Sequence, residues 1–580
     1  MKLSDYLAEV LAKEVKHVFC GNGGVVIHIL DSIERRSDIK LVPCENEQGA
    51  AIAAEAYSRV SGNLGVAVAT SGPGMLNLMQ GIGCAYYDSI PALFISGAPP
   101  TGHLKGTRKV RQLGFQEMDV VDIVRSLTKY AVLVTDPKKI RYEIEKLIYM
   151  AKEGRPGPVM LDLPDDLQRA EINPEELEPF VSNNIVSDKD FGKEIKQILE
   201  MIKSAERPVI IVGGGVKLSK TEDFMKAFIK KSGVPVATTW ATIDMFLEDE
   251  PGLIGNFGVS ANRYGNFAIQ TADLIISFGS RLDTHETGSN PSSFAPKAKK
   301  VMIDIDIHEL NRGNGLEIDL KIEADLKVFL KQLQQFDVVT KDLIKWKSRI
   351  KEWRKKYPIC YPEYRDRKEL VNPYVFMDEL SRLTRPGDII ITDAGGTLTW
   401  TMQSYKIRKP QMLFSAFNHS PMGYSLPASI GAQFAAPDRQ VICIIGDGGM
   451  NMNIQELETI IFNKLPIKIF VIDNNEYGII KQTQDTWMNS HYVGSDETSG
   501  LGFPDLIAIA KAYGYETSEI KSHKELVENI SDVLKRQGPI LCDVRVKHGE
   551  QLLPKLVFGR PLDDLAPLLD RGELKKNLEF

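Results

Sequence analysis

The sequence predicts an α/β protein built from three doubly wound parallel-sheet domains, and two observations lead to this fold class. Short apolar runs rich in Val, Ile and Leu alternate with helix-like segments in three separate blocks of the chain. That alternation is typical of parallel sheets covered by helices on both faces. The length of 580 residues also exceeds one ordinary domain, and domain sizes suggest about three or four.

The first and second blocks each end in a polar or charged segment. Residues 1–165 form the first expected domain, with the apolar runs HVFC, IKLVPC, LGVAVATSG, PALFISG and GPVMLDLP. A polar, proline-bearing linker follows. Residues 186–340 form the second expected domain, with RPVIIVGGGV, VPVATTW, ADLIISFG and KVMIDIDI. The charged segment DLIKWKSRIKEWRKKYP then predicts a connecting helix with a solvated face.

The third block, residues 371–560, contains the runs DIIITDAGG, QVICIIGDGG, IKIFVIDNN and PILCDVRV. Its strand–helix rhythm is similar to that of the first block, which predicts two related sheets. Residues 561–580 form a charged tail. This tail is either a lid or packing segment over the active site or a merely exposed terminus.

Composition limits the partners of the chain. Hydrophobic residues make up 43% and charged residues 26%, and the net charge is −6, which gives no signal for nucleic acid. No apolar stretch is long enough to span a bilayer, and the N-terminal segment lacks a signal peptide's cleavage pattern. The six scattered cysteines lack CxxC or metal-ligand spacing, which favours buried thiols in a reducing compartment. We expect a cytoplasmic protein that binds neither nucleic acid nor membrane.

Two polar clusters, GDGG and DNNEYG, each follow an apolar run, and they place Asp447 and Asn474 at the ends of successive strands. A segment with helical apolar spacing separates them, so a strand–helix–strand unit brings both to one sheet edge. Carboxylate, amide and backbone oxygens are hard ligands that Mg²⁺ accepts together with phosphates. Alone, GDGG fits an ordinary turn equally well; the pair predicts a site for a diphosphate held through a divalent ion.

The pair resembles the thiamine diphosphate motif, in which GDG is followed after a fixed interval by NN. The spacing here is 474 − 447 = 27 residues, the interval of that family. The resemblance implies that Mg²⁺ is bound by Asp447, Asn474 and the backbone carbonyl of Glu476. It also implies that Gly448, Gly449, Asn474 and Tyr477 lie beside the cofactor. One departure is that Asp473 replaces the first Asn, at a position that is not a ligand.

Further motifs resemble the acetolactate synthase group, whose members bind thiamine diphosphate. CENEQGAA resembles its HEQGAA segment, with Asn46 in place of His, which implies Glu47 as the activator of the cofactor's aminopyrimidine ring. TDAGGT implies Gly395, Gly396 and Thr397 on the diphosphate side, and SPMGYSLPASIGA implies Met422 as the wedge beneath the cofactor. The three domains are then pyrimidine-binding, FAD-binding-like and diphosphate-binding.

The resemblance also implies an oligomer, because the activating glutamate reaches a cofactor held by the partner subunit. We therefore expect a homodimer or homotetramer with its active site at the subunit interface. Gly24 aligns with a glycine that lines the pocket. GFQE resembles the family's AFQE segment and gives Phe115 and Gln116. Gln116 either hydrogen-bonds the reacting oxygens or packs at the dimer interface.

The middle block resembles the FAD-binding stretches of acetolactate synthases, in which the flavin is structural. The strand ends where a dinucleotide would lie carry Gly213, Gly214, Gly215, Arg281, Asp283, Asp304 and Asp306. We expect FAD there; the alternative is a middle domain that binds nothing.

The resemblance implies decarboxylation of a 2-oxo acid such as pyruvate, followed by transfer of the two-carbon unit to a second carbonyl. The expected acceptor pocket departs from the family. Thr483 replaces a tryptophan, and polar side chains replace apolar walls; the tentative set is Asn22, Phe115, Asn418, His419 and Thr483. Such groups favour a polar ketone or aldehyde, for example a nucleotide-linked ketosugar, unless they reflect drift in loops away from the substrate.

Several other functions stay open. The closest is a plain acetolactate synthase that condenses two pyruvates; a simple 2-oxo acid decarboxylase and a flavin-using pyruvate oxidase are further alternatives. A non-catalytic paralogue would be expected to lack Glu47, Asp447 or Asn474, and all three are present. A nicotinamide dehydrogenase would need a GxGxxG turn, for which GNGG is too short.

Overall fold

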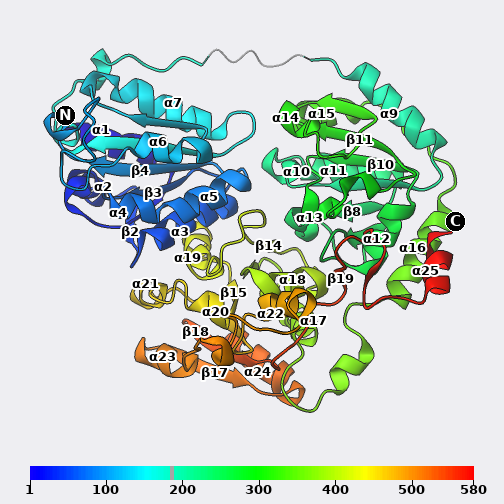
Figure 1. Ribbon diagram of the computed structural model, residues 1–580. Coiled ribbons are helices and arrows are strands. Elements are labelled where there is room, and N and C mark those ends of the chain that lie inside the picture. The colour runs from blue at the N-terminus through cyan, green and yellow to red at the C-terminus, as the bar shows by residue number, and fades with distance from the viewer. Residues whose placement is uncertain (183–188, 580) are drawn as a thin grey trace.

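The computed structural model describes residues 1–182 and 189–579 and contains three six-stranded sheets with helices around them (Figure 1). Every pairing within these sheets is parallel, which confirms the predicted fold class. The expected start of the second domain, residue 186, lies outside the described residues.

The first sheet has the strand order β2-β1-β3-β4-β6-β5. Its central strands are runs of fully buried Val, Ala and Ile, as expected for strands covered on both faces. The strands are β1 His17–Cys20, β2 Lys40–Pro43, β3 Gly65–Ala69, β4 Ala92–Ala98, β5 Tyr130–Leu133 and β6 Pro158–Pro164. The main helices are α1 Leu3–Glu14, α2 Ile27–Glu34, α3 Glu47–Ser61, α5 Met79–Tyr87 and α7 Ile140–Lys152.

The third sheet repeats the topology of the first. Its order is β14-β13-β15-β16-β18-β17, which is the first order with twelve added to each number, so the prediction of two related sheets is confirmed. Its strands are β13 Ile389–Thr392, β14 Met412–Phe414, β15 Val441–Gly446, β16 Lys468–Asp473, β17 Glu516–Ile520 and β18 Ile540–Arg545. The helices used below are α18 Gly395–Ser404, α19 Ser425–Ala435, α20 Asp447–Met450 and α22 Gly478–Trp487.

The central sheet has a different order, β12-β11-β10-β7-β8-β9. The strands are β7 Pro208–Val212, β8 Val236–Thr238, β9 Leu253–Asn256, β10 Leu274–Phe278, β11 Lys299–Asp304 and β12 Leu320–Glu323. Helices used below are α10 Gly215–Leu218, α12 Arg263–Thr271, α13 Thr284–Thr287 and α14 Ile307–Leu310.

The first and third domains share one apolar core, to which residues of both sheets contribute. At its centre α3 packs on α19 so closely that a methyl group on Gly431 would lie 1.9 Å from the carbonyl oxygen of Ala53. The central domain has its own cores. This arrangement places the first and third sheets beside each other, with the central domain alongside (Figure 1).

The predicted connecting helix is α16, Ile344–Lys356, which buries Trp346, Ile350 and Trp353 and exposes most of its charged residues. The C-terminal tail ends in α25, Arg571–Leu578, drawn in red in Figure 1. It packs on α16, where Trp353 Nε1 donates to Asn577 Oδ1 at 3.1 Å. The tail is thus a packing segment of the central domain.

The six cysteines are free thiols, and four of them are buried. Across residues 1–182 and 189–579, no helix combines the length and apolar character that crossing a bilayer requires.

Candidate functional site

The strand-end residues predicted from the two polar clusters do meet. β15 and β16 are neighbouring parallel strands, and Asp447 and Asn474 follow their carboxyl ends. Asp447 Oδ2 accepts hydrogen bonds from the backbone N–H groups of Asn474 at 3.1 Å and Asn475 at 2.6 Å. Its Oδ1 accepts from Gly448 N at 2.6 Å. One carboxylate therefore joins the two turns into a single site.

The surroundings of Asp447 disfavour the charged form of its carboxyl group. Burial and the neighbouring Asp473 raise the pKa of the Asp447 carboxyl well above its usual range, because a buried anion beside another carboxylate is unfavourable. Asp473 itself pairs with Arg545. A divalent ion coordinated by Asp447 would favour the charged form. The described residues contain no cluster of three or more His, Cys, Asp or Glu side chains suited to a metal, so any ion here needs amide, main-chain and phosphate oxygens as well.

The turn that carries Glu476 is braced by its own side chain. Lys481 Nζ lies 2.9 Å from Glu476 Oε2 and 2.8 Å from Asp496 Oδ2, and Gly549 N donates to Glu476 Oε1 at 2.5 Å. Within the described chain, no hydrogen bond reaches the main-chain oxygen of Glu476. The side chain is thus engaged in structure, while the carbonyl predicted to be a ligand stays available.

Glycines open the space beside this edge. A methyl group on Gly448 would lie 2.2 Å from Tyr477 Cε1 and 3.2 Å from Met422 Cε, so Met422 and Tyr477 both lie against Gly448. On the adjoining turn, Thr397 Oγ1 lies 3.2 Å from the position of a methyl group on Gly446. The structure therefore gathers three separate predicted motifs around α20.

Gly395 and Gly396 open α18 on the same side of the sheet. Gly395 has φ +69°, a left-handed conformation that favours glycine. A methyl group on it would lie 3.8 Å from Ile479 Cγ2 of α22. Gly395 therefore lies beside the helix that follows Tyr477, whereas a methyl group on Gly396 would lie 3.2 Å from the ring of Trp400.

Asp393 is a buried residue of this site that the sequence analysis missed. Its carboxylate accepts from Gly423 N at 3.0 Å and Ser425 N at 3.1 Å, directly after Met422. A methyl group on Gly449 would lie 2.1 Å from Asp393 Oδ2. Burial raises the pKa of Asp393 to about 6. The signal was present, since Asp393 follows β13 in the TDAGGT motif as Asp447 follows β15.

Glu47 occupies the start of α3 in the first domain. Asn46 caps this helix by accepting from Gln48 N at 2.8 Å, and Glu47 Oε2 accepts from Asn77 Nδ2 at 2.9 Å. Two glycine turns enclose the side chain: a methyl group on Gly21 would lie 2.3 Å from Glu47 Cγ, and one on Gly74 would lie 3.1 Å from Oε1. These glycines hold the carboxylate in one position.

Two other predicted residues adjoin this turn. No heavy atom lies within 4 Å of a methyl group built on Gly24, so Gly24 borders open space. Gln116, with φ 59°, packs its Cβ 3.1 Å from a methyl group on Gly72. Phe115 points outward with 84% of its surface exposed. Gln116 therefore lies near Glu47, whereas the side chain of Phe115 is mostly exposed.

Glu47 and the Asp447 cluster lie in different domains, and no hydrogen bond or ion pair between described residues joins them directly. Contacts beside them do cross: Asn46 N donates to Glu456 Oε1, and Gln48 Nε2 donates to Asn453 Oδ1, both at 3.0 Å. The start of α3 is thus fixed against the third domain, while Glu47 itself faces the Asn77 side.

Two of the five residues expected around the acceptor, Asn418 and His419, lie at a contact between domains. Asn418 Nδ2 donates to Asp88 Oδ1 at 2.6 Å, and the Asn418 Oδ1 accepts from Arg281. His419 stacks on Tyr87 with ring centroids 5.5 Å apart. Both residues therefore belong to the contact between the third domain and α5.

The remaining members of that set make local contacts. Asn22 Oδ1 accepts from the neighbouring Gly23 N at 2.8 Å. Thr483 Oγ1 donates to Ile479 O of its own helix at 2.9 Å. Asn22 and Thr483 are exposed, so their polar atoms face the surroundings of the chain.

The glycines expected at FAD have a structural explanation within the chain. A methyl group on Gly213 would lie 2.3 Å from the carbonyl oxygen of Gly279. A methyl group on Gly215 would lie 2.9 Å from the Cα of Gly279. A methyl group on Gly214 would lie 3.3 Å from Ala241 Cβ. The tight approach of two backbones therefore requires at least Gly213 and Gly215.

The charged residues expected at FAD also have partners. Asp283 caps α13 by accepting from His285 N at 2.9 Å, and Arg281 donates to Asp283 at 3.1 Å. Asp306 caps α14 and pairs with Arg155 of the first domain at 2.9 Å. Burial raises the pKa of Asp304 to about 6. A cavity of about 160 Å³ adjoins Arg281, which is smaller than the roughly 300–1,000 Å³ of ligand pockets.

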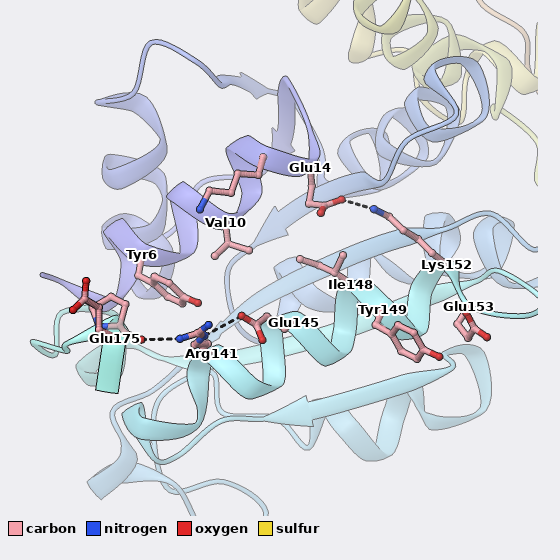
Figure 2. Close-up of a pocket in the computed structure, with 12 residues that line it drawn as sticks. Tyr6, Val10, Glu14, Arg141, Glu145, Ile148, Tyr149, Lys152, Glu153 and Glu175 are labelled. Carbon is pink, nitrogen blue, oxygen red and sulfur yellow. Dashed lines mark hydrogen bonds and ion pairs between the residues drawn. The ribbon is translucent and has the colours of Figure 1, made fainter. Parts of the chain in front are cut away.

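A larger cavity, about 570 Å³, lies between α1 and α7 on the outside of the first domain (Figure 2). Two ion pairs lie in its lining: Arg141 pairs with Glu145 at 3.0 Å, and Lys152 pairs with Glu14. None of the predicted site residues lines this cavity. The candidate site is therefore the edge of the third sheet together with the Glu47 turn.

Comparison with known proteins gives the class of this chain. Models of the N-terminal TPP binding, central and C-terminal TPP binding domains of thiamine pyrophosphate enzymes match residues 1–123, 195–333 and 393–544. The chain is thus a thiamine pyrophosphate enzyme, as the motifs predicted.

Relatives narrow the class. Over 577 residues the chain is 33% identical to acetolactate synthase 2, chloroplastic, of Nicotiana tabacum. The aligned region covers 97% of this chain and 85% of that protein. Over 567 residues it is 32% identical to the acetolactate synthase large subunit of Pyropia yezoensis, covering 96% and 93%. The chain belongs to the acetolactate synthase family, an enzyme family of the carboligase type.

Proposed function

We propose that this enzyme decarboxylates pyruvate and joins the two-carbon unit to a carbonyl acceptor, with a polar ketone or aldehyde preferred. The observation that carries the proposal is the meeting of Met422, Tyr477 and Gly448 next to Asp447. Thiamine diphosphate, when bound, supplies a carbon nucleophile and an electron sink for the carbon–carbon cleavage. The residues of the chain hold, orient and activate it.

We infer that Mg²⁺ is bound by Asp447, Asn474 and the main-chain oxygen of Glu476. The donor set supports this, because all three are hard oxygen ligands and a cofactor diphosphate would complete the coordination. The brace between Glu476 and Lys481, at 2.9 Å, keeps the turn in place. Asp393 in turn fixes the backbone after Met422, so that Met422 stays against Gly448.

Glu47 is proposed as the group that exchanges a proton with the cofactor's pyrimidine ring. Its Oε2 accepts a hydrogen bond from Asn77 at 2.9 Å, which orients the carboxylate. The glycines around it leave the space that the Glu47 side chain occupies. Because the Asp447 cluster of the same chain does not contact Glu47, the site is proposed to form between two copies. Exposed aromatic side chains near the third-domain site support this: Trp487 is 62% and Phe558 70% exposed.

Two acceptor classes compete. The hydroxyl of Thr483 and the amide of Asn22 support a polar acceptor, since polar groups select partners that can hydrogen-bond once a second copy of the chain encloses them. The identity to acetolactate synthases over nearly the full chain favours the second candidate, condensation of two pyruvates. Because Asn418 and His419 are engaged between domains, the polar-acceptor proposal rests on the smaller pair.

Product analysis with labelled pyruvate, thiamine diphosphate and Mg²⁺ tests the proposal, first alone and then with a panel of ketosugars and simple ketones. We expect slow acetolactate formation that is displaced by a branched adduct with one polar acceptor. Fast acetolactate formation that ignores the panel would establish the second candidate. Free acetaldehyde, or oxygen consumption with acetate, would overturn both in favour of a decarboxylase or an oxidase.

We also propose that the central domain binds FAD with a structural role. The support is the position of Asp283, Asp304 and Asp306 at strand ends of one sheet edge; the packing role of Gly213 and Gly215 speaks against it. Visible absorption of the purified protein, and flavin released on denaturation, decides the matter without an activity assay.

The six free thiols suit a reducing compartment, and we propose the cytoplasm. The tobacco relative is named chloroplastic. Microscopy of a tagged chain in its own cell tests the location directly.

A further inference from the structure

A basic loop, residues 103–115, precedes Gln116, which lies near the Glu47 turn, and no part of the proposed function above uses it. It carries Lys105, Arg108, Lys109 and Arg111 and no acidic residue. In the sequence, Asp88 is the one acid between Glu55 and Glu117, although the whole chain has a net charge of −6. The loop therefore carries a local excess of positive charge, although the chain as a whole is negatively charged.

The loop has a built base. Glu117 is 8% exposed, and its carboxylate accepts from the backbone N–H groups of Lys105 at 2.5 Å, Leu113 at 2.8 Å and Gly114 at 3.3 Å. Gln112 Nε2 closes the loop further by donating to Glu117 O at 3.1 Å. One buried carboxylate thus ties both ends of the loop together and fixes what the loop presents.

Three of the four cations on the loop have no acidic partner. Lys105 pairs with Asp119 at 2.6 Å. Among the residues that the structure describes, Arg108, Lys109 and Arg111 form no ion pair, and all three are exposed. Arg108 Nη1 donates only to main-chain oxygens within the loop, at 3.1 and 3.2 Å. Three like charges within four positions repel one another, so a bound anion would be stabilised by all of them.

Contacts connect the loop to the candidate site. The loop leads directly into Gln116, whose Cβ lies 3.1 Å from a methyl group built on Gly72. Gly74 follows Gly72 by two residues, and a methyl group on Gly74 would lie 3.1 Å from Glu47 Oε1. The unpaired cations therefore lie on the loop that leads into Gln116, and the exposed ring of Phe115 adds an apolar face to the same loop.

We propose that the basic loop binds a phosphate or diphosphate group on the acceptor substrate. The carboxylate of pyruvate carries one negative charge and needs one cation, whereas a diphosphate offers several oxygens to the arginine and lysine donors. The diphosphate of the cofactor belongs to the Mg²⁺ edge of the third sheet and leaves these cations free. This inference rests on the proposed function and names the substrate class of the same site.

The test uses the full chain saturated with thiamine diphosphate and Mg²⁺, with UDP as the probe in titration calorimetry. The triple variant Arg108→Gln/Lys109→Gln/Arg111→Gln removes the unpaired cations. Its matched control is Lys345→Gln/Lys347→Gln/Lys351→Gln on α16, which removes the same charge from exposed positions. We expect the triple variant to bind UDP at least about tenfold more weakly, which corresponds to about 1.4 kcal/mol, and the control to match the wild type.

Equal weakening in both variants, or no UDP binding by the wild type, would overturn the proposal. Acetolactate formation from pyruvate alone is the second readout, and we expect the triple variant to retain it. Loss of that activity in parallel with UDP affinity would show a general role of the loop and refute the assignment to a phosphate. A change in the pyruvate-only rate on adding UDP would assign the loop to an effector instead. Absence of any pyruvate turnover by the wild type would refute the proposed function, while the UDP titration would still judge the loop.

Discussion

Gly448 shows at the residue scale how this site depends on a missing side chain. Tyr477 and Met422 come from segments on either side of it in the sequence, and both occupy the volume that a methyl group at position 448 would need. Asp393 and Asp447 fix the surrounding backbone, because each carboxylate accepts hydrogen bonds from two or more backbone N–H groups in segments that follow other strands. Buried carboxylates therefore hold the turns, and glycines leave the space.

We predict that Gly448→Ala lowers the affinity for thiamine diphosphate by at least about tenfold. The added methyl group would meet Tyr477 at 2.2 Å and Met422 at 3.2 Å, so both side chains must rotate into the space beside the cofactor. Quenching of intrinsic fluorescence on titration with thiamine diphosphate and Mg²⁺ measures the affinity. The control is Gly102→Ala, where no atom lies within 4 Å; equal affinities in the two variants would contradict the prediction.

At the scale of elements, a buried ionic network fixes the segment that precedes Met422. Arg59 of α3 pairs with Glu55 at 2.5 Å and with Asp88 at 2.6 Å. Tyr424 donates to Glu55 at 2.7 Å. Asp88 also accepts from Phe417 N at 2.9 Å. Two helices of the first domain thus hold a loop of the third through one chain of charges.

We predict that Asp88→Asn destabilises residues 417–420 by about 3 kcal/mol, because it removes a buried charge partner and an acceptor of backbone N–H groups. Asp88 is 4% and Arg59 9% exposed in the side chain, so solvent screens the pair weakly. Hydrogen exchange of these amides should accelerate. Asp31→Asn, whose partner Arg35 is 75% exposed, should leave exchange there unchanged. Unaltered protection in Asp88→Asn would refute the role of the network.

A second element-scale prediction concerns β6, where Asp162 lies buried and accepts from Ser96 of β4 at 2.6 Å. Burial raises the pKa of Asp162 from 3.8 to about 7. The folded state therefore keeps a proton that the unfolded state releases, and the stability present below pH 4 is lost as pH rises to about 7, on the order of 4 kcal/mol. In Asp162→Asn this slope should disappear from thermal midpoints measured between pH 4 and 8.

Ser96→Ala supplies the matched comparison. The Ser96 hydroxyl lowers the pKa of Asp162 against the effect of burial, so its removal should extend the loss of stability to higher pH. An identical pH dependence in wild type, Asp162→Asn and Ser96→Ala would show that Asp162 does not titrate as proposed.

The apolar runs located most of the strands that bury both faces, together with the edge strand β2, and missed several other edge strands. β3 is buried throughout and reads as a continuous apolar run. β5, β12 and β17 lie at sheet edges and keep most of their residues partly exposed, so no apolar run marks them. The same limit applies to the site. Asp447 and Asn474 could be predicted because both follow the carboxyl ends of strands. The positions of Asn418 and His419 depend on the packing of α5 and the residue after it against the third domain, which a local sequence pattern does not encode.

At the scale of the whole molecule, the separation of Glu47 from the Asp447 cluster makes assembly part of the proposed catalysis. The relevant surfaces on both sides expose large apolar groups, including Phe115 on the first domain and Trp487 on the third. Burial of such side chains against a second copy is favourable. In the proposed dimer, each chain contributes half of each of two sites.

Mixing two inactive variants tests this arrangement. Glu47→Gln removes the proton-exchanging group, and we expect a loss of about 10²–10⁴-fold in turnover; Asp447→Ala removes the proposed metal ligand. After subunit exchange, half of the dimers pair one variant with the other, and one of their two sites is intact. Activity should therefore recover to about a quarter of the wild type. Recovery absent under conditions where tagged subunits demonstrably exchange would place both residues in one chain's site.

Asn418 joins all three domains: its amide nitrogen binds Asp88 of the first domain, its oxygen binds Arg281 of the central domain, and its backbone continues toward Met422 in the third. This junction limits how the chain can be recombined with its relatives. A chimera cut at the linkers would keep every sheet intact and still separate Arg281 from the loop it contacts. A chimera that replaces the central domain must therefore also replace Asn418, which contacts Arg281, and Asp88, which contacts Asn418, because the central domain does not stand apart from them.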